Sequence, residues 1–177
     1  METRIARIAL LGVLLGVGCS SEPADDPNGY AHILPFDTAV VRVASAKDTA
    51  RLAVELAESE KQKTMGLMER RSLPPNAGML FLYTATQPPT AAFWMFRTRI
   101  PLDIAYIDSA GVIRSIVAMQ PCESQLAQGC PTYPPGAPYR AALEVNAGFF
   151  AQRGIRAGDR VILQDTAIRR RAARVAR

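Results

Sequence analysis

Hydrophobic and polar residues alternate most clearly near the end of the first third of the chain. Leu52, Val54 and Leu56 take every second position of residues 51–57. A period of two places these side chains on one face of a strand, because successive strand residues point to opposite sides. Together with the short β-prone run at 40–44, this pattern predicts a pair of strands with one buried face.

The pattern then changes to the period of a helix. Ser59 and Gln62 stand three residues apart, as the N-cap and N3 residues of a capping box do. Met65 and Met68 follow at helical spacing and predict the apolar face of a short helix. The two prolines and the asparagine of residues 74–76 end this unit, since proline cannot continue a helix.

The rest of the chain predicts further strands. Residues 78–83 form a continuous apolar run, typical of a central strand that is buried on both faces. A turn sequence at 108–111 predicts a hairpin between its two neighbouring runs. The remaining expected elements are strands at 102–107, 112–119, 139–145 and 160–163, and a helical turn at 147–153 capped by Gly154. About seven short strands with two helical pieces predict a mainly β fold, a small jelly-roll-like sandwich or barrel.

Residues 92–111 have the most unusual composition of the chain, including its only Trp. We predict that this segment begins with one strand and bends at Pro101. The alternating positions of that strand are Trp94, Phe96, Thr98 and Ile100 on one face, and Phe93, Met95, Arg97 and Arg99 on the other. One face is therefore aromatic, whereas the other changes from apolar to basic.

Composition and charge limit the classes of protein. With 177 residues, 49% of them hydrophobic and 21% charged, the chain is typical of one globular domain. The net charge of +5 is matched by the five arginines of residues 169–177, while residues 20–37 carry four acids and no Lys or Arg. Because the body is nearly neutral, the charge does not predict a nucleic-acid groove, and we expect no nucleic-acid partner.

The N-terminus predicts export. Residues 1–18 combine two arginines with an apolar run too short to span a bilayer, as in a signal peptide. Cys19 follows small residues and resembles the lipidated cysteine of bacterial lipoproteins; cleavage that removes Cys19 is the alternative. We expect a lipidated Cys19 with a flexible linker at 19–38, one β domain at 39–165 and a basic tail at 166–177. The lipid would anchor the protein to a membrane on the periplasmic side of the envelope.

Histidine and cysteine are scarce, which limits the chemistry further. The only histidine, His32, lies in the linker, so the domain cannot assemble a Ser-His-Asp triad, a Cys-His pair or a His-based metal site. We expect neither a metal nor a cofactor. Cys122 and Cys130 are separated by seven residues, and an oxidising compartment would join them in a disulfide. A redox or metal-binding thiol pair is the alternative, although the usual spacing and a third ligand are missing.

Several ordered blocks of sequence resemble the signature of one family. These blocks are residues 55–57, 66–68, 78–81, 93–95, 100–103, 143–148 and 154–159. Over about residues 40–164 the chain resembles the domain of unknown function family 192, also called uncharacterised protein family 0127. The resemblance implies a small, mostly β, jelly-roll-like fold and, for many members, export. It implies no particular activity.

Five polar residues make the best candidate site: Arg97, Arg99, Asp103, Glu144 and Asn146. The two arginines could clamp a carboxylate, a phosphate or a sugar acid. Asp103 and Glu144 could act as a general acid and base, as in glycoside hydrolysis. The alternative is structural, with the arginines paired to the two carboxylates as a brace.

The aromatic face of the predicted strand also allows two interpretations. Trp94 and Phe96 could stack on a sugar, but a buried aromatic face is the more common arrangement. The basic tail could contact anionic lipid or another envelope polymer, or stay solvated. We therefore predict a non-enzymatic ligand-binding or interaction module of the envelope, with a polymer or a protein as partner. The alternatives are an envelope hydrolase or transferase that uses Asp103 and Glu144, and an accessory protein in envelope assembly.

Overall fold

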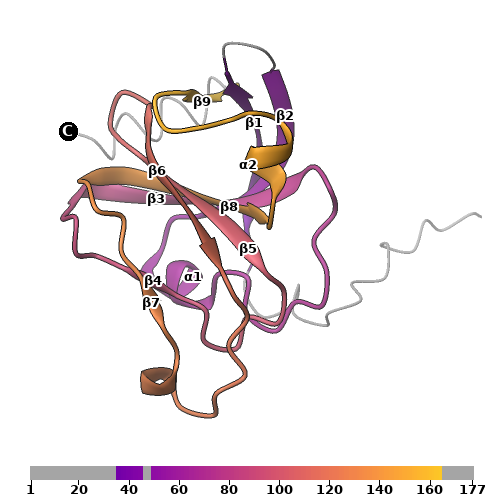
Figure 1. Ribbon diagram of the computed structural model, residues 1–177, viewed down its shortest axis with the longest axis vertical. Helices are drawn as coiled ribbons and strands as arrows, with labels where there is room; N and C mark the ends of the chain where they lie inside the picture. The colour runs from indigo at the N-terminus through magenta and orange to yellow at the C-terminus, as the bar shows by residue number, and fades with distance from the viewer. Residues whose placement is uncertain (1–34, 46–48, 165–177) are drawn as a thin grey trace, which may run out of the picture.

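A curled β-sheet forms the body of the molecule (Figure 1). The computed structural model describes residues 35–45 and 49–164. The large sheet consists of β1 (Asp37–Ala44), β2 (Thr49–Ala57), β3 (Ala77–Gln87), β5 (Leu102–Ile107), β6 (Ile113–Met119), β8 (Tyr139–Asn146) and β9 (Arg160–Leu163). A small sheet pairs β4 (Phe93–Trp94) with β7 (Thr132–Tyr133), and the helices are α1 (Glu60–Met65), α2 (Phe149–Gln152) and a 3-10 turn at Ala127–Gly129. The fold is therefore mainly β, as the sequence predicts.

The seven strands curl into a half-barrel. Their order is β6-β5-β8-β3-β2-β1-β9, and all neighbours are antiparallel except β2 and β3, which α1 connects. The two edges of the sheet approach each other where Val112 bridges to Arg160. The backbone N–H of Val161 also donates to the carbonyl oxygen of Gly111 at 2.9 Å. These contacts between the first and last strands of the order hold the curl.

Each face of the sheet packs its own hydrophobic cluster. α2 lies over the concave side, here called the inner face, and α1 with β4 and β7 lies over the other side, the outer face (Figure 1). The inner cluster includes Val54, Leu56, Leu80, Ala105, Leu143, Val145, Phe149 and Phe150. The outer cluster includes Met79, Phe81, Met95, Leu102, Ile104, Tyr106, Met119 and Ala142. Both faces of the central strands are thus removed from water, which explains the continuous apolar run in β3.

The period-two pattern and the capping box are both confirmed. Leu52, Val54 and Leu56 of β2 are buried. The backbone N–H of Gln62 donates to the Ser59 hydroxyl at 3.2 Å, and the Ser59 N–H donates to the Gln62 side chain at 2.9 Å. The helix ends at Met65, earlier than predicted, because Gly66 has a φ of +49° that stops the helical geometry. The hairpin of β5 and β6 is also confirmed.

The prediction of one regular strand at residues 93–100 is wrong. Only Phe93 and Trp94 are in β4, and the chain then turns, with the Thr98 N–H donating to the Met95 carbonyl oxygen at 2.9 Å. Arg97 has a φ of +56°, which lies outside the β region of the backbone. The alternation of faces therefore ends after two residues. Met95 is buried, whereas Trp94, expected on the buried face, is 41% exposed.

Four sequence predictions fall on residues outside the described part of the chain. They are the signal peptide at 1–18, the lipidation of Cys19, most of the linker to residue 34, and the basic tail. Within residues 35–45 and 49–164, no helix has the length and apolar character needed to cross a membrane.

Candidate functional site

A buried carboxyl group lies at the centre of the outer face. Glu144 on β8 stands between its register partners, Met79 of β3 and Ile104 of β5. Both partners belong to the outer cluster, so the Glu144 side chain points to that face. It is 4% exposed. Gly78 allows β3 to pack this tightly, because a Cβ there would lie 2.5 Å from the carbonyl oxygen of Glu144.

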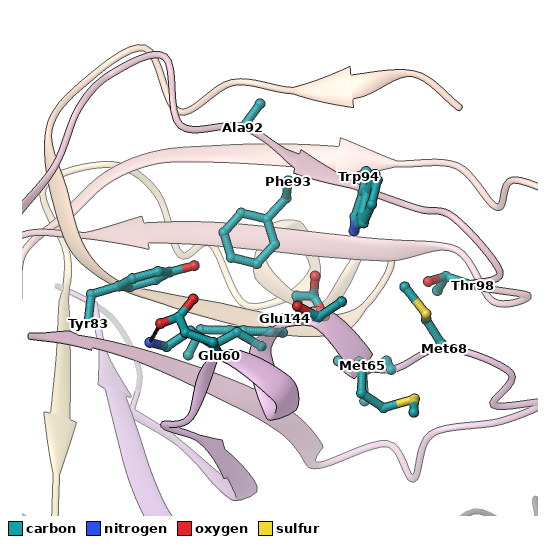
Figure 2. Close-up of a pocket in the computed structure, with 14 residues that line it drawn as sticks. Glu60, Met65, Met68, Tyr83, Ala92, Phe93, Trp94, Thr98 and Glu144 are labelled. Atoms are coloured by element: carbon teal, nitrogen blue, oxygen red, sulfur yellow. Dashed lines mark hydrogen bonds and ion pairs between the residues drawn. The ribbon is translucent and has the colours of Figure 1, made fainter. Parts of the chain in front are cut away.

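The Glu144 side chain forms the floor of a cavity of about 200 Å³. The walls include Met65 and Met68 from α1 and the turn after it, Phe81 and Tyr83 from β3, and Phe93 and Trp94 from β4. In Figure 2 the hydroxyl group of Tyr83, the indole nitrogen of Trp94 and the carboxyl group of Glu144 point toward the space below the Phe93 ring. Because Trp94 is partly exposed, it marks the mouth of the cavity.

The environment of Glu144 changes its acidity. Burial raises the pKa of Glu144 to about 8, and the positive charge of Arg70 offsets only part of this rise. Arg70 is itself bound by Glu55 through two hydrogen bonds of 2.5 and 2.6 Å. At neutral pH the Glu144 carboxyl group is therefore mostly protonated, and it titrates within the physiological range.

No hydrogen bond to the Glu144 carboxyl group is formed within the described ranges. Every fully enclosed side-chain nitrogen or oxygen of the described residues has a partner. The Glu144 oxygens are therefore not fully enclosed, and they reach the free space of the cavity. An acid in this position can pair with a molecule that enters the cavity.

Two tyrosines hold the roof of the cavity to the sheet. The Tyr106 hydroxyl on β5 donates to the carbonyl oxygen of Tyr133 at 2.5 Å, and the Tyr139 hydroxyl on β8 donates to that of Ala91 at 3.0 Å. The Phe93 ring packs against both, with its centroid 5.7 Å from that of Tyr106 and 6.4 Å from that of Tyr139. The cavity is thus bounded by ordered contacts on its roof as well as on its floor.

Asp103, the second predicted carboxyl group, lies on the opposite face. It pairs in register with Val145, whose side chain belongs to the inner cluster. Its carboxyl group accepts the backbone N–H of Gly148 at 2.9 Å and that of Phe150. Burial raises the pKa of Asp103, and these two hydrogen bonds counteract the rise. Asp103 therefore caps the start of α2, where the N-cap residue Gly148 has no side chain to do so.

The two arginines are bound together by a carboxylate that the sequence argument did not consider. Nε of Arg97 lies 2.5 Å from one oxygen of Glu69, and Nε of Arg99 lies 2.7 Å from the other. Burial acts to raise the pKa of Glu69, but the hydrogen bonds from Arg99 and Arg97 hold it below its ordinary value. The predicted brace thus exists with a different carboxylate, because the turn at residues 95–98 directs both arginines away from Asp103 and Glu144.

The arginine cluster borders a second, larger hollow of about 600 Å³. Its other lining residues include Phe96, Cys122, Glu123, Ser124 and Gln125. Cys122 and Cys130 form a disulfide, as predicted, and it anchors this loop beside the arginines. Both arginine side chains are about half exposed, so a role in binding an anion stays a prediction.

Asn146, the last candidate, is used in the fold. Its side-chain nitrogen donates to the carbonyl oxygens of Leu73 and Pro74 at 3.0 and 3.1 Å. The five candidates are therefore divided among an arginine cluster, a helix cap, a cavity floor and a loop brace. Within residues 35–45 and 49–164, no group of three or more His, Cys, Asp or Glu side chains is arranged to hold a metal ion.

Sequence reasoning missed the residues that surround Glu144. The two methionines and Tyr83 were assigned to the core or to a strand, and Trp94 to a buried face. One signal was available, since a lone Glu stands among apolar residues in the run at 141–145. A charged residue inside a buried strand without a sequence-visible partner points to a site.

Fold and site together define a small β domain with a buried acid in an aromatic cavity. The chain belongs to the DUF192 family, described as "Uncharacterized ACR, COG1430", whose match covers residues 41–163. No curated protein matches the chain.

Two solved structures are similar to this chain. A protein of Sinorhizobium meliloti 1021, described as a candidate transcription regulator, is 34% identical with a TM-score of 0.64; the match covers 73% of this chain and 96% of that one. A protein of unknown function from Novosphingobium aromaticivorans DSM 12444 is 29% identical with a TM-score of 0.65, covering 81% of this chain and 94% of that one. Both likenesses support the half-barrel fold.

Proposed function

We propose that this chain is a non-enzymatic binding module of the cell envelope, and that its ligand binds in the cavity above Glu144. The observation that carries the proposal is the Glu144 carboxyl group, which is buried, opens into the cavity and accepts no hydrogen bond from the described residues. A buried acid without a partner lowers stability relative to an apolar side chain of similar size. A ligand that pairs with the acid gives a reason for its presence.

The alternative of a hydrolase or transferase required Asp103 and Glu144 to share one cleft. A carboxylate pair in such enzymes flanks the bond that is broken. The register of β5 and β8 places the two side chains on opposite faces of the sheet. For this reason we propose binding rather than catalysis by that pair.

The N-terminal sequence supports an envelope location, with a lipid on Cys19 and a linker that separates the domain from the membrane. Metabolic labelling with a palmitate analogue tests the anchor. Label is expected on the wild-type chain and not on the Cys19→Ala variant. A labelled variant, or an unlabelled wild type, would contradict the proposed anchor.

The description of the Sinorhizobium meliloti relative as a regulator is not extended to this chain. Recognition of DNA by a helix requires one long enough to lie in the major groove. The two α-helices of the described residues, α1 and α2, contain six and four residues. Nothing in their length favours base recognition.

The only Trp of the chain makes the cavity directly observable. The Trp94 indole N–H gives one NMR signal from the cavity mouth. We would screen small cationic, neutral and anionic fragments against the full chain and follow this signal together with the backbone signals of Gly66 and Thr98, which also line the cavity. Fragments that bind are expected to shift all three. Binding confined to residues of the second hollow, such as Ser124, or no binding at all, would reject the proposal.

A further inference from the structure

The walls of the Glu144 cavity favour positively charged groups. The rings of Tyr83, Phe93 and Trp94 surround it (Figure 2), and Met65 and Met68 also line it. The faces of aromatic rings carry partial negative charge and attract cations within about 6 Å of the ring centroid, with Trp the strongest. The carboxyl group on the floor adds a full negative charge when it is ionised.

A lysine of the protein already shows this chemistry at the rim. Nζ of Lys63 lies 4.7 Å from the centroid of the Tyr83 ring and 2.8 Å from Oε1 of Glu60. An aromatic face and a carboxylate thus share one ammonium group. Because Glu60 balances Lys63, and Glu55 binds Arg70, the charge of an ionised Glu144 is left without a dedicated counter-charge.

The distribution of hydrogen-bonding groups distinguishes between kinds of ammonium. A primary ammonium has three N–H donors, each of which needs an acceptor when it is buried. Tyr83, Thr64 and Thr98 carry the hydroxyl groups among the lining residues. Tyr83 and Thr98 lie at opposite ends of the cavity, with Glu144 between them (Figure 2). A primary ammonium would therefore have to pair its three donors with acceptors on different sides of the cavity. A trimethylated ammonium instead presents methyl groups to the rings and has no N–H donor to leave unpaired.

The volume of the cavity limits the size of its ligand. Drug-sized ligands occupy pockets of roughly 300–1,000 Å³. A cavity of about 200 Å³ holds a smaller molecule, or the head group of a larger one whose remainder extends past Trp94. A compact trimethylammonium group meets this limit.

We propose that the cavity binds a small methylated ammonium group, whose positive charge pairs with the carboxylate of Glu144. This inference rests on the proposed binding function and names the chemical class of the ligand.

Binding of such a cation is coupled to a proton. The empty cavity keeps Glu144 mostly protonated at neutral pH, and an incoming cation favours the ionised form, so a proton leaves to solvent. The other charged groups around the cavity are Arg70, after α1, and the Lys63–Glu60 pair on it.

The phenol groups that interact electrostatically with Glu144 belong to Tyr83 on β3 and Tyr106 on β5. Burial raises the pKa of both tyrosines well above the usual range, so they stay neutral between about pH 6 and 8. The pH dependence of cation binding in that interval is therefore assigned to Glu144.

Choline and its neutral carbon analogue 3,3-dimethylbutan-1-ol test the inference, because they have nearly the same shape and differ in charge. Each would be titrated into the full chain while the Trp94 fluorescence and indole NMR signal are followed. We expect choline to bind at least about tenfold more tightly than the alcohol at pH 8, and its affinity to fall by at least about tenfold at pH 6. Calorimetry in buffers of different ionisation enthalpy should show proton release on binding to the wild type.

The variant Glu144→Gln keeps the shape of the side chain and removes its charge. We expect it to lose at least about tenfold in choline affinity and all of the pH dependence. Glu123→Gln, at an exposed position outside the cavity, is the matched control and should bind as the wild type does. The proton release measured on the wild type keeps the test valid if Glu144→Gln fails to fold.

The outcomes separate this inference from the proposed function. Equal binding of choline and the alcohol, with no effect of Glu144→Gln, would reject the ammonium class and leave the cavity as a binding site. The same holds if choline has no effect while neutral or anionic fragments shift the Trp94 signal. If no probe or fragment shifts that signal, both the inference and the proposed function are rejected.

Discussion

The two buried carboxyl groups of the sheet, Asp103 and Glu144, lie on opposite faces and have different surroundings. On the inner face, Asp103 accepts two backbone N–H groups at the start of α2. On the outer face, Glu144 has no donor among the described residues and opens into a cavity. Burial raises the pKa of both, but only Asp103 has hydrogen bonds that counteract it. The hydrogen bonds to α2 therefore give a structural reason for the burial of Asp103, whereas no hydrogen bond of the described residues gives one for Glu144.

The layers that cover the two faces account for this difference. On the inner face, α2 is only four residues long, yet Phe149 and Phe150 are both buried and fill the space beneath it. On the outer face, the cover consists of separate short pieces, namely α1, the turn after it, and the two-residue strands β4 and β7. The six residues of α1 include none that is fully buried. A cover that buries so little leaves room for the cavity.

Removal of the inner acid should cause the largest loss of stability. Asp103→Ala leaves the N–H groups of Gly148 and Phe150 without their acceptor in a buried environment, so we expect a loss of about 3 kcal/mol in the free energy of unfolding. Urea unfolding, followed by Trp94 fluorescence, measures it. Asp159→Ala is the matched control, because Asp159 accepts the N–H of Arg156 in an exposed turn; its loss should stay below about 1 kcal/mol. Equal losses would contradict the assignment of Asp103 as a buried cap.

Replacement of the outer acid should instead raise the free energy of unfolding at high pH. The pKa of Glu144 is about 8 in the folded protein and near its ordinary value of 4.5 in the unfolded chain. Between these values the folded state binds the extra proton, so the contribution of Glu144 to stability is lost as the pH rises from 4.5 to 8. Because glutamine does not titrate, we expect Glu144→Gln to match the wild type near pH 4.5 and to be more stable by about 5 kcal/mol near pH 9, since each unit of pKa difference corresponds to about 1.4 kcal/mol.

Unfolding in urea at these two pH values and near pH 7 measures the change. Glu123→Gln is the control, since that residue is exposed, and it should show no such trend. A difference between Glu144→Gln and the wild type that does not depend on pH would indicate that Glu144 is ionised in the cavity, and the two faces would then differ less than the structure indicates.

Much of this architecture could be predicted, because the signals were local. The alternation in β2, the capping box of Ser59 and Gln62 and the hairpin turn at 108–111 each fix a few neighbouring residues. The strand at 139–145 was predicted as well, and with it the presence of Glu144 in a strand. Local periodicity therefore predicted that Glu144 lies in a strand, but it did not predict which face of the sheet the side chain points to or which residues surround it.

The rest depended on contacts between residues distant in sequence. Whether Asp103 and Glu144 share a face follows from the register of β5 with β8, about forty positions apart, which no local pattern records. Similarly, Glu69 meets Arg97 because both residues adopt positive φ values and their backbones join by a hydrogen bond of 2.7 Å. Such geometry is uncommon for residues other than glycine, so propensity alone predicts a regular strand instead.

The carboxylate of Glu69 should show the smallest effect on stability, and it offers the sharpest comparison with Glu144. It lies on the same side of the sheet, but Arg97 and Arg99 bind both of its oxygens. Burial acts to raise its pKa, but the hydrogen bonds from Arg99 and Arg97 hold it below its ordinary value. The stabilisation by this carboxylate is therefore present above the ordinary pKa and lost as the pH falls below it. We expect Glu69→Gln to lose about 1 kcal/mol at pH 7, because both arginines are half exposed, and the loss to shrink near pH 3. Urea midpoints at both pH values measure this, with Glu60→Gln as the control, because the Glu60 side chain is itself 90% exposed. If Glu69→Gln instead gained stability with rising pH, as expected for Glu144→Gln, the unpaired state would be a property of the whole outer layer rather than of the cavity floor.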